Sequence, residues 1–150
     1  MTSNEERATT LVRALQAGAE RDRSALQALL TADVRAWTPA LSTASLTELI
    51  EELDRRDEAF SDIELDVAPL DVSGDYACVE WTVRMSHTGA IALPADRTIE
   101  PSGIRVTVHG VTVAEFEGDR ICSFRQYWDE FSVFQQLGAP SDEAPSALGR

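Results

Sequence analysis

One carboxylate, Asp129, lies near the end of the chain directly after two aromatic residues, Tyr127 and Trp128. It belongs to a strand-like run that a Gly118-Asp119 turn opens. A charged side chain among apolar neighbours costs free energy unless it has a partner or a chemical task. The run therefore leaves two interpretations open, a general base or an ion pair between Asp129 and Arg125.

Alternation along an extended strand decides which side chains share a face. It predicts one face made of Ile121, Ser123, Arg125, Tyr127 and Asp129. The opposite face then carries Cys122, Phe124, Gln126, Trp128 and Glu130. Arg125 could polarise a substrate carbonyl, or it could neutralise Asp129 and so spoil the base.

The remaining reactive side chains are few. His87 and His109 could meet across neighbouring strands, but two histidines without a third ligand predict no metal site. Cys78 and Cys122 lack CxxC spacing and lie in strand-like runs, so we expect free thiols in a reducing cytoplasm.

Helical periodicity fills the first part of the chain and strand alternation fills the rest. Asp22 can cap a short helix, and Ser45 with Glu48 forms a capping box before a longer one. Helices are expected over 5–17, 22–30 and 46–60; strands over 34–38, 63–68, 76–87 and 105–116, with a hairpin turn at 117–120 and an irregular connection over 88–103.

This order predicts an α+β domain over residues 1–138, with about three N-terminal helices on one face of a curved antiparallel sheet. Residues 139–150 are rich in Pro, Ser and Ala and are expected to form a disordered tail. Because the strands carry apolar residues on both faces, we expect a homodimer through the open sheet face.

Charge and hydropathy limit the partners. The net charge of −13 argues against nucleic acid and anionic membranes, which would be repelled. The polar, acidic N-terminus does not look like a signal peptide, and no apolar run approaches the length of a bilayer span. A cytoplasmic protein is expected.

Several landmarks follow one another in an order that resembles the SnoaL-like proteins of the NTF2-like superfamily over residues 5–138. They are Ala59-Phe60-Ser61-Asp62, Glu80-Trp81-Thr82, Ser86-His87-Thr88-Gly89, Pro101-Ser102-Gly103, Glu117-Gly118-Asp119-Arg120-Ile121, Tyr127-Trp128-Asp129 and Gln135-Gln136-Leu137-Gly138. The resemblance implies a conical α+β fold around a pocket.

The resemblance also implies a chemistry. In SnoaL-like polyketide cyclases an aspartate late in the last long strand is the general acid/base of a cofactor-free aldol closure, and Asp129 matches that position. The proposed catalytic set is Asp129, Tyr127, Arg125 and His109. The proposed set that binds a hydrophobic small molecule is Trp37, Trp81, His87 and Trp128.

Three departures qualify this reading. Phe124 and Arg125 occupy positions where relatives often carry a His-Trp pair. The first 75 residues contain no Tyr, which disfavours a ketosteroid isomerase, and Arg125 with Asp129 supplies only part of the Asp-Arg-Asp set of epoxide hydrolase relatives. Three classes therefore stay open: a cofactor-free acid/base enzyme, a non-catalytic binding protein and an interaction module.

Overall fold

The computed structural model describes residues 3–71 and 74–138. Three helices come first: α1 (Asn4–Glu20), α2 (Arg23–Leu29) and α3 (Leu46–Ala59), with β1 (Leu30–Trp37) and β2 (Ser42–Thr43) between the second and third. The later strands are β3 (Phe60–Leu70), β4 (Tyr76–His87), β5 (Ile91–Leu93), β6 (Arg97–Ile99), β7 (Arg105–Glu117) and β8 (Arg120–Trp128), and α4 (Glu130–Gln136) follows them.

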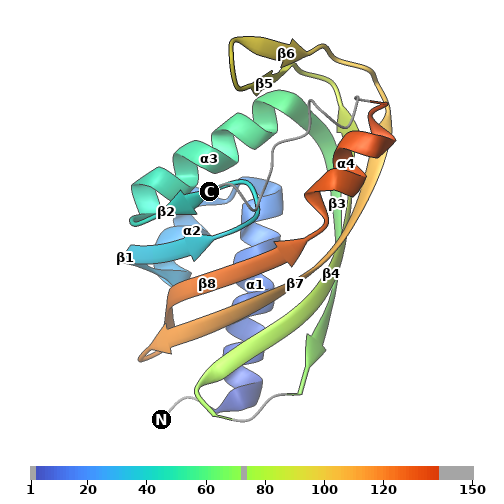
Figure 1. Ribbon diagram of the computed structural model, residues 1–150. Helices are drawn as coiled ribbons and strands as arrows, with labels where there is room; N and C mark the ends of the chain where they lie inside the picture. The colour runs from blue at the N-terminus through green and yellow to red at the C-terminus, as the bar shows by residue number, and fades with distance from the viewer. Residues whose placement is uncertain (1–2, 72–73, 139–150) are drawn as a thin grey trace.

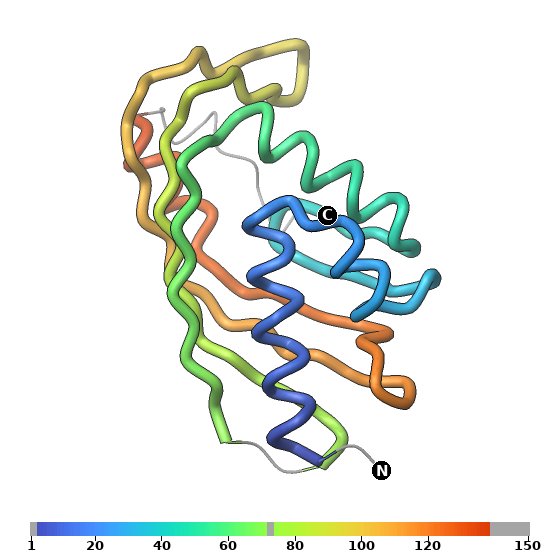
Figure 2. Tube along the Cα trace, turned by 180° about the vertical axis from the view of Figure 1, so that it is seen from behind, coloured from blue at the N-terminus to red at the C-terminus, as the bar shows by residue number. Residues whose placement is uncertain are grey.

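The long strands form one curved six-stranded sheet in the order β2-β1-β8-β7-β4-β3 (Figure 1). Seen from behind, α1, α2 and α3 lie on one side of this sheet (Figure 2). Their buried side chains, such as Leu11, Leu26 and Leu49, pack with Val79 and Ala114 of the central strands. The α+β class is confirmed.

Two details of the predicted sheet are wrong. The pair β1–β8 is parallel, although an antiparallel sheet was expected; the other pairs in the sheet are antiparallel. The connection over 88–103 also contains the small β5–β6 hairpin. Its turn places Ala95 and Asp96 at positive φ, which an irregular-loop interpretation did not anticipate.

Helix starts follow the predicted caps. The Asp22 side chain accepts from the amide of Ala25 at 3.0 Å, and Ser45 accepts from the amide of Glu48 at 3.2 Å. A fourth helix, α4, was not predicted; it begins where the last strand had been expected to continue.

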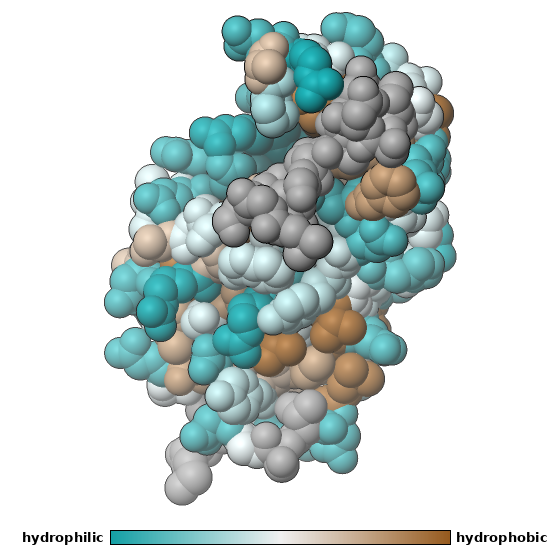
Figure 3. All heavy atoms as spheres, viewed as in Figure 1, coloured by the Kyte–Doolittle hydropathy of each residue, from teal (hydrophilic) through white to brown (hydrophobic). Residues whose placement is uncertain are grey.

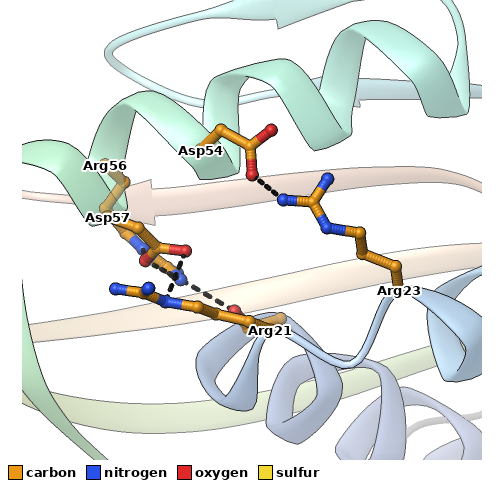
Figure 4. Close-up of polar contacts among 6 residues, drawn as sticks. Arg21, Arg23, Asp54, Arg56 and Asp57 are labelled. Atoms are coloured by element: carbon orange, nitrogen blue, oxygen red, sulfur yellow. Dashed lines mark hydrogen bonds and ion pairs between the residues drawn. The ribbon is translucent and has the colours of Figure 1, made fainter.

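Charged side chains join α3 to the turn between α1 and α2 (Figure 4). Asp57 accepts from Arg21 Nε at 3.0 Å and from Arg56 Nη2 at 2.8 Å, while Arg56 also donates to the carbonyl of Gly18 at 2.7 Å. Arg23 pairs with Asp54 one turn earlier. These contacts hold the helical layer together above the sheet.

Candidate functional site

Among the described residues, no helix lies over the centre of the sheet on the side away from α1 (Figure 1). We call the side chains on this side the open face. Register assigns its residues: Arg35 and Trp37 from β1; Ser123, Arg125 and Tyr127 from β8; His109, Val111, Val113 and Glu115 from β7; Cys78, Glu80 and Thr82 from β4; Asp66 and Ala68 from β3. Figure 3 shows hydrophobic residues gathered on this face over β7 and β4.

A β-bulge determines which β8 residues reach the open face. Phe116 pairs with Ile121 and Glu115 pairs with Ser123, so Cys122 is the extra residue. Ile121 is therefore buried with the helices, whereas simple alternation had placed it beside Ser123. From Ser123 to Trp128 the predicted alternation is correct.

The first of two hollows on the open face has a volume of about 550 Å³ and is bordered by several groups capable of proton transfer. Its lining residues are Asp66, Val67, Ala68, Glu80, Trp81, Thr82, His109, Gly110, Val111 and Tyr127. The Nδ1 atom of His109 lies 3.0 Å from the Thr82 hydroxyl, which fixes the ring in the strand. The hollow thus combines carboxylates, an imidazole and a phenol with aliphatic walls.

A second hollow of about 500 Å³ lies at the β1–β8 end of the face and reaches the start of α3. Arg35, Trp37, Ser123 and Arg125 line it. The rings of Trp37 and Tyr127 lie between the two hollows, with centroids 5.3 Å apart.

Asp129 lies just beyond the last strand instead of within it. β8 ends at Trp128, which pairs with Gly110, so Asp129 leaves the ladder at the level of His109. It is exposed, and its side chain caps α4 by accepting from the amide of Ser132 at 3.1 Å. The strand stops here because the cap turns the backbone into a helix.

Arg125 does not neutralise this carboxylate. Its guanidinium pairs instead with Glu115 on the neighbouring strand, at 3.2 Å. Within residues 3–71 and 74–138, Asp129 has no ion pair, so the alternative of an Arg125–Asp129 pair is wrong.

Trp81 and Trp128 point to the opposite, helix-facing side and contact each other edge to face at 6.0 Å. The indole N–H of Trp81 donates to Thr112 Oγ1 at 2.9 Å, and Gln126 Nε2 lies 3.1 Å from the same oxygen. Trp81 also covers Gly110, where an added Cβ would lie 2.3 Å from its ring. Thr112 and Gln126 were missed; their signal was a polar residue at an apolar position in each strand.

His87 lies apart from all of these residues. It is fully buried, its ring packs near Phe60, and its Nδ1 lies 2.9 Å from the Ser102 hydroxyl and accepts from the Ser102 amide at 3.2 Å. These contacts tie the long 88–104 connection to the end of β4. The structure therefore separates His87 from the other proposed binding residues.

Neither cysteine forms a disulfide. Burial, followed by the nearby Glu80, raises the pKa of the Cys78 thiol, and burial likewise raises the pKa of Cys122. Both thiols are therefore poor nucleophiles at neutral pH. In the described part of the chain, no cluster of three His, Cys, Asp or Glu side chains has metal-binding geometry. No described helix is long and apolar enough to cross a membrane.

Solved structures show the same fold at low sequence identity. A protein from Jannaschia sp. CCS1 described as a SnoaL-like polyketide cyclase superposes with a TM-score of 0.79 at 20% identity, covering 91% of this chain and 94% of its own. TsrD from Streptomyces laurentii superposes with a TM-score of 0.78 at 22% identity, and the match covers 93% of this chain and 100% of TsrD.

A third structure, an LEH-like epoxide hydrolase from M. tuberculosis, gives a TM-score of 0.63 at 18% identity, covering 89% of this chain and 90% of its own. No curated protein matches the chain. The model of one family, described as SnoaL-like polyketide cyclase, matches residues 9–137. With this match spanning most of its length, the chain belongs to the SnoaL-like polyketide cyclase family.

Proposed function

We propose that this protein is a SnoaL-like enzyme that applies cofactor-free acid/base chemistry to a hydrophobic carbonyl compound. The observation that carries the proposal is the family match over residues 9–137. The hollow of about 550 Å³ supports it, because carboxylates, an imidazole and a phenol meet there beside aliphatic walls. Hydrophobic ligand sites combine apolar walls with a few polar groups in this way.

Asp129 is the proposed base. Its carboxylate removes a proton from a carbon between two carbonyl groups, and the electron pair of the broken C–H bond moves onto a carbonyl oxygen. In a cyclisation, the enolate carbon then bonds to a second carbonyl carbon, and the resulting alkoxide takes the proton back from Asp129. One cap hydrogen bond occupies Asp129, and no arginine of the described residues 3–71 and 74–138 pairs with it.

The other proposed residues bind the substrate and polarise its carbonyl groups. Tyr127, almost half exposed on the same face, donates to the enolate oxygen in this scheme, and His109 supports proton transfer beside it. Arg125 keeps donors beyond its contact with Glu115. Trp37 and Trp81 are proposed as walls, and the contribution of Trp128 and His87 is indirect, through the sheet that positions those walls.

The replacement Asp129→Asn tests the mechanism. It keeps an oxygen that can cap α4 but removes the base, so we expect turnover of an active polycyclic ketone or steroid to fall at least about a hundredfold with binding retained. Thermal-shift screening first identifies a ketone or steroid that binds. Its turnover is then measured from the change in absorbance of this compound. Asp119→Asn, in the exposed β7–β8 turn, is the matched control. Turnover that survives Asp129→Asn would falsify the assignment.

A non-catalytic ligand-binding or interaction protein is the alternative. Trp81 is 8% exposed and its indole N–H is hydrogen-bonded to Thr112, so side chains of the protein itself fill this part of the helix-facing side. Ligands that bind without turnover would favour this alternative, and a screen without hits would favour the interaction module.

The proposal includes a homodimer through the open face and a cytoplasmic location. The two free thiols are consistent with a reducing compartment, and the charge of −13 disfavours nucleic acid and anionic membrane as partners. Size-exclusion chromatography with light scattering tests for the dimer. A monomer at micromolar concentration would refute the proposed homodimer.

A further inference from the structure

We propose that the smaller hollow binds an aromatic acid, whose carboxylate lies between Arg35 and Arg125 and whose ring lies against Trp37. The inference goes beyond the proposed function, because the chemistry proposed above belongs to the larger hollow. The smaller hollow, of about 500 Å³, has a volume within the roughly 300–1,000 Å³ that is typical of ligand sites. It lies at the edge of the sheet, where β1 meets the outermost strand β2, and it reaches the start of α3.

Two arginines line this hollow from neighbouring strands. Arg35 on β1 pairs with Ser123 on β8, and Trp37 pairs with Arg125, so the two arginines are diagonal neighbours on one face. With a strand spacing of about 4.8 Å and a rise of about 3.3 Å per residue, their Cα atoms lie about 8 Å apart. Because both side chains are long, their guanidinium groups can contact one anion placed between them.

Arg35 carries a positive charge that the protein does not neutralise. The side chain is exposed, and its guanidinium has no ion pair or hydrogen bond within residues 3–71 and 74–138. The chain has 26 acidic side chains against 13 basic ones, so acidic partners are plentiful in the sequence, yet none pairs with Arg35. Arg125 pairs with Glu115 at 3.2 Å, but a guanidinium has five N–H donors, and most of them stay available for a ligand.

The carboxylate that also lines the hollow, that of Glu48, is already occupied. Its Oε2 atom accepts from the amide of Ala44 at 2.7 Å, and it lies in the first turn of α3, where the helix dipole offsets part of its charge. Arg125 and Glu115 neutralise each other, so the charge of Arg35 remains. A single positive charge favours a carboxylate, which is a monoanion, over a phosphate monoester, which carries about −1.5 to −2 at pH 7.

The other lining residues determine the shape of the ligand. Ser42 and Ser123 line the hollow, and their hydroxyl groups can donate to a carboxylate oxygen. The Trp37 ring, 41% exposed, supplies an aromatic surface beside the arginines, and its contact with Tyr127 holds it between the two hollows. A planar acid can therefore form charge-assisted hydrogen bonds at one end and stack on an aromatic ring at the other.

Binding of naphthoate tests the site, because this molecule combines one carboxylate with a planar ring. Isothermal titration calorimetry measures the dissociation constant. We expect Arg35→Gln and Arg125→Gln each to weaken binding at least about fivefold, because each variant loses charge-assisted hydrogen bonds to the carboxylate. Trp37→Leu should also weaken binding, through the loss of the ring contact. Arg13→Gln, which changes an exposed arginine of α1 outside the hollow, is the matched control and should bind as the wild type does.

Three related molecules test the chemistry of the ligand. Naphthalenemethanol keeps the ring without the charge, and inorganic phosphate is an anion without a ring. Each should bind at least about tenfold more weakly than naphthoate, because each lacks one half of the contacts. Naphthyl phosphate should bind more weakly than naphthoate, since only one positive charge is free. Tighter binding of the phosphate would overturn the assignment of a carboxylate, and equal binding of the alcohol would overturn the anion site.

Two further results would overturn the inference: no binding of naphthoate to the wild-type chain at millimolar concentration, or equal affinity in the wild type and both arginine variants. Arg35 is exposed, so Arg35→Gln should keep the wild-type fold and association state, which circular dichroism and light scattering check. Naphthoate that binds as expected, while no ketone or steroid is turned over, would refute the proposed function and leave this site in place.

Discussion

At the scale of single residues, Thr112 shows how the sheet holds its aromatic side chains. It is fully buried on β7 and accepts from the Trp81 indole, which lies against Gly110. A buried donor that loses its acceptor costs more than an average hydrogen bond contributes, because the donor stays desolvated. Thr112 therefore fixes the position of the Trp81 ring on the helix-facing side of the sheet.

Replacing Thr112 by Val should destabilise the fold by about 1–3 kcal/mol, because the Trp81 N–H then stays buried without an acceptor. Urea unfolding followed by tryptophan fluorescence measures this change. Thr112→Ser keeps the hydroxyl and should recover most of the loss. Equal losses in the two variants would mean that the methyl group, and not the hydrogen bond, stabilises the site.

At the scale of elements, the sheet depends on a helical layer that is joined by charged contacts. Asp57 is 9% exposed and accepts from two arginines, whereas Asp54, one turn earlier on α3, is 43% exposed and pairs with one (Figure 4). Buried, multiply bonded carboxylates are costly to remove, and exposed ion pairs contribute little.

Asp57→Ala should therefore lower the free energy of unfolding by about 2 kcal/mol or more, since it leaves the partly buried Arg56 without its carboxylate. The matched change Asp54→Ala should cost less than about 1 kcal/mol. Chemical denaturation of both variants provides the comparison. Similar costs at the two positions would contradict the assigned role of Asp57 as the main contact between α3 and the α1–α2 turn.

At the scale of the whole molecule, the charge of −13 opposes association of two copies while the open face favours it. Repulsion between net charges acts at long range and is screened by salt, with a Debye length of about 30 Å at 0.01 M and about 10 Å at 0.1 M.

The dimer should therefore become tighter as sodium chloride rises from about 0.01 M to about 0.1 M. Sedimentation equilibrium across this range measures the dissociation constant. The Arg97→Glu variant, which makes the chain more negative at a distant site, should show a steeper dependence. A dissociation constant that rises with salt would show that local ion pairs outweigh the net charge.

The sequence by itself determined the elements whose causes are local. The caps at Asp22 and Ser45 and the period-two run from Tyr76 to His87 depend on neighbours along the chain, and the structure has them as expected. The α+β class followed from the order of these elements. The family followed from the order of short landmarks spread along the chain.

Only the tertiary structure decided which side chains meet. The bulge at Cys122 puts Ile121 and Ser123 on opposite faces of the sheet, and it arises from the pairing with β7. The strand ends at Asp129 because this residue caps the helix that follows. Arg125 pairs with Glu115 instead of Asp129 for a similar reason: cross-strand neighbours are set by register, which a single strand cannot reveal.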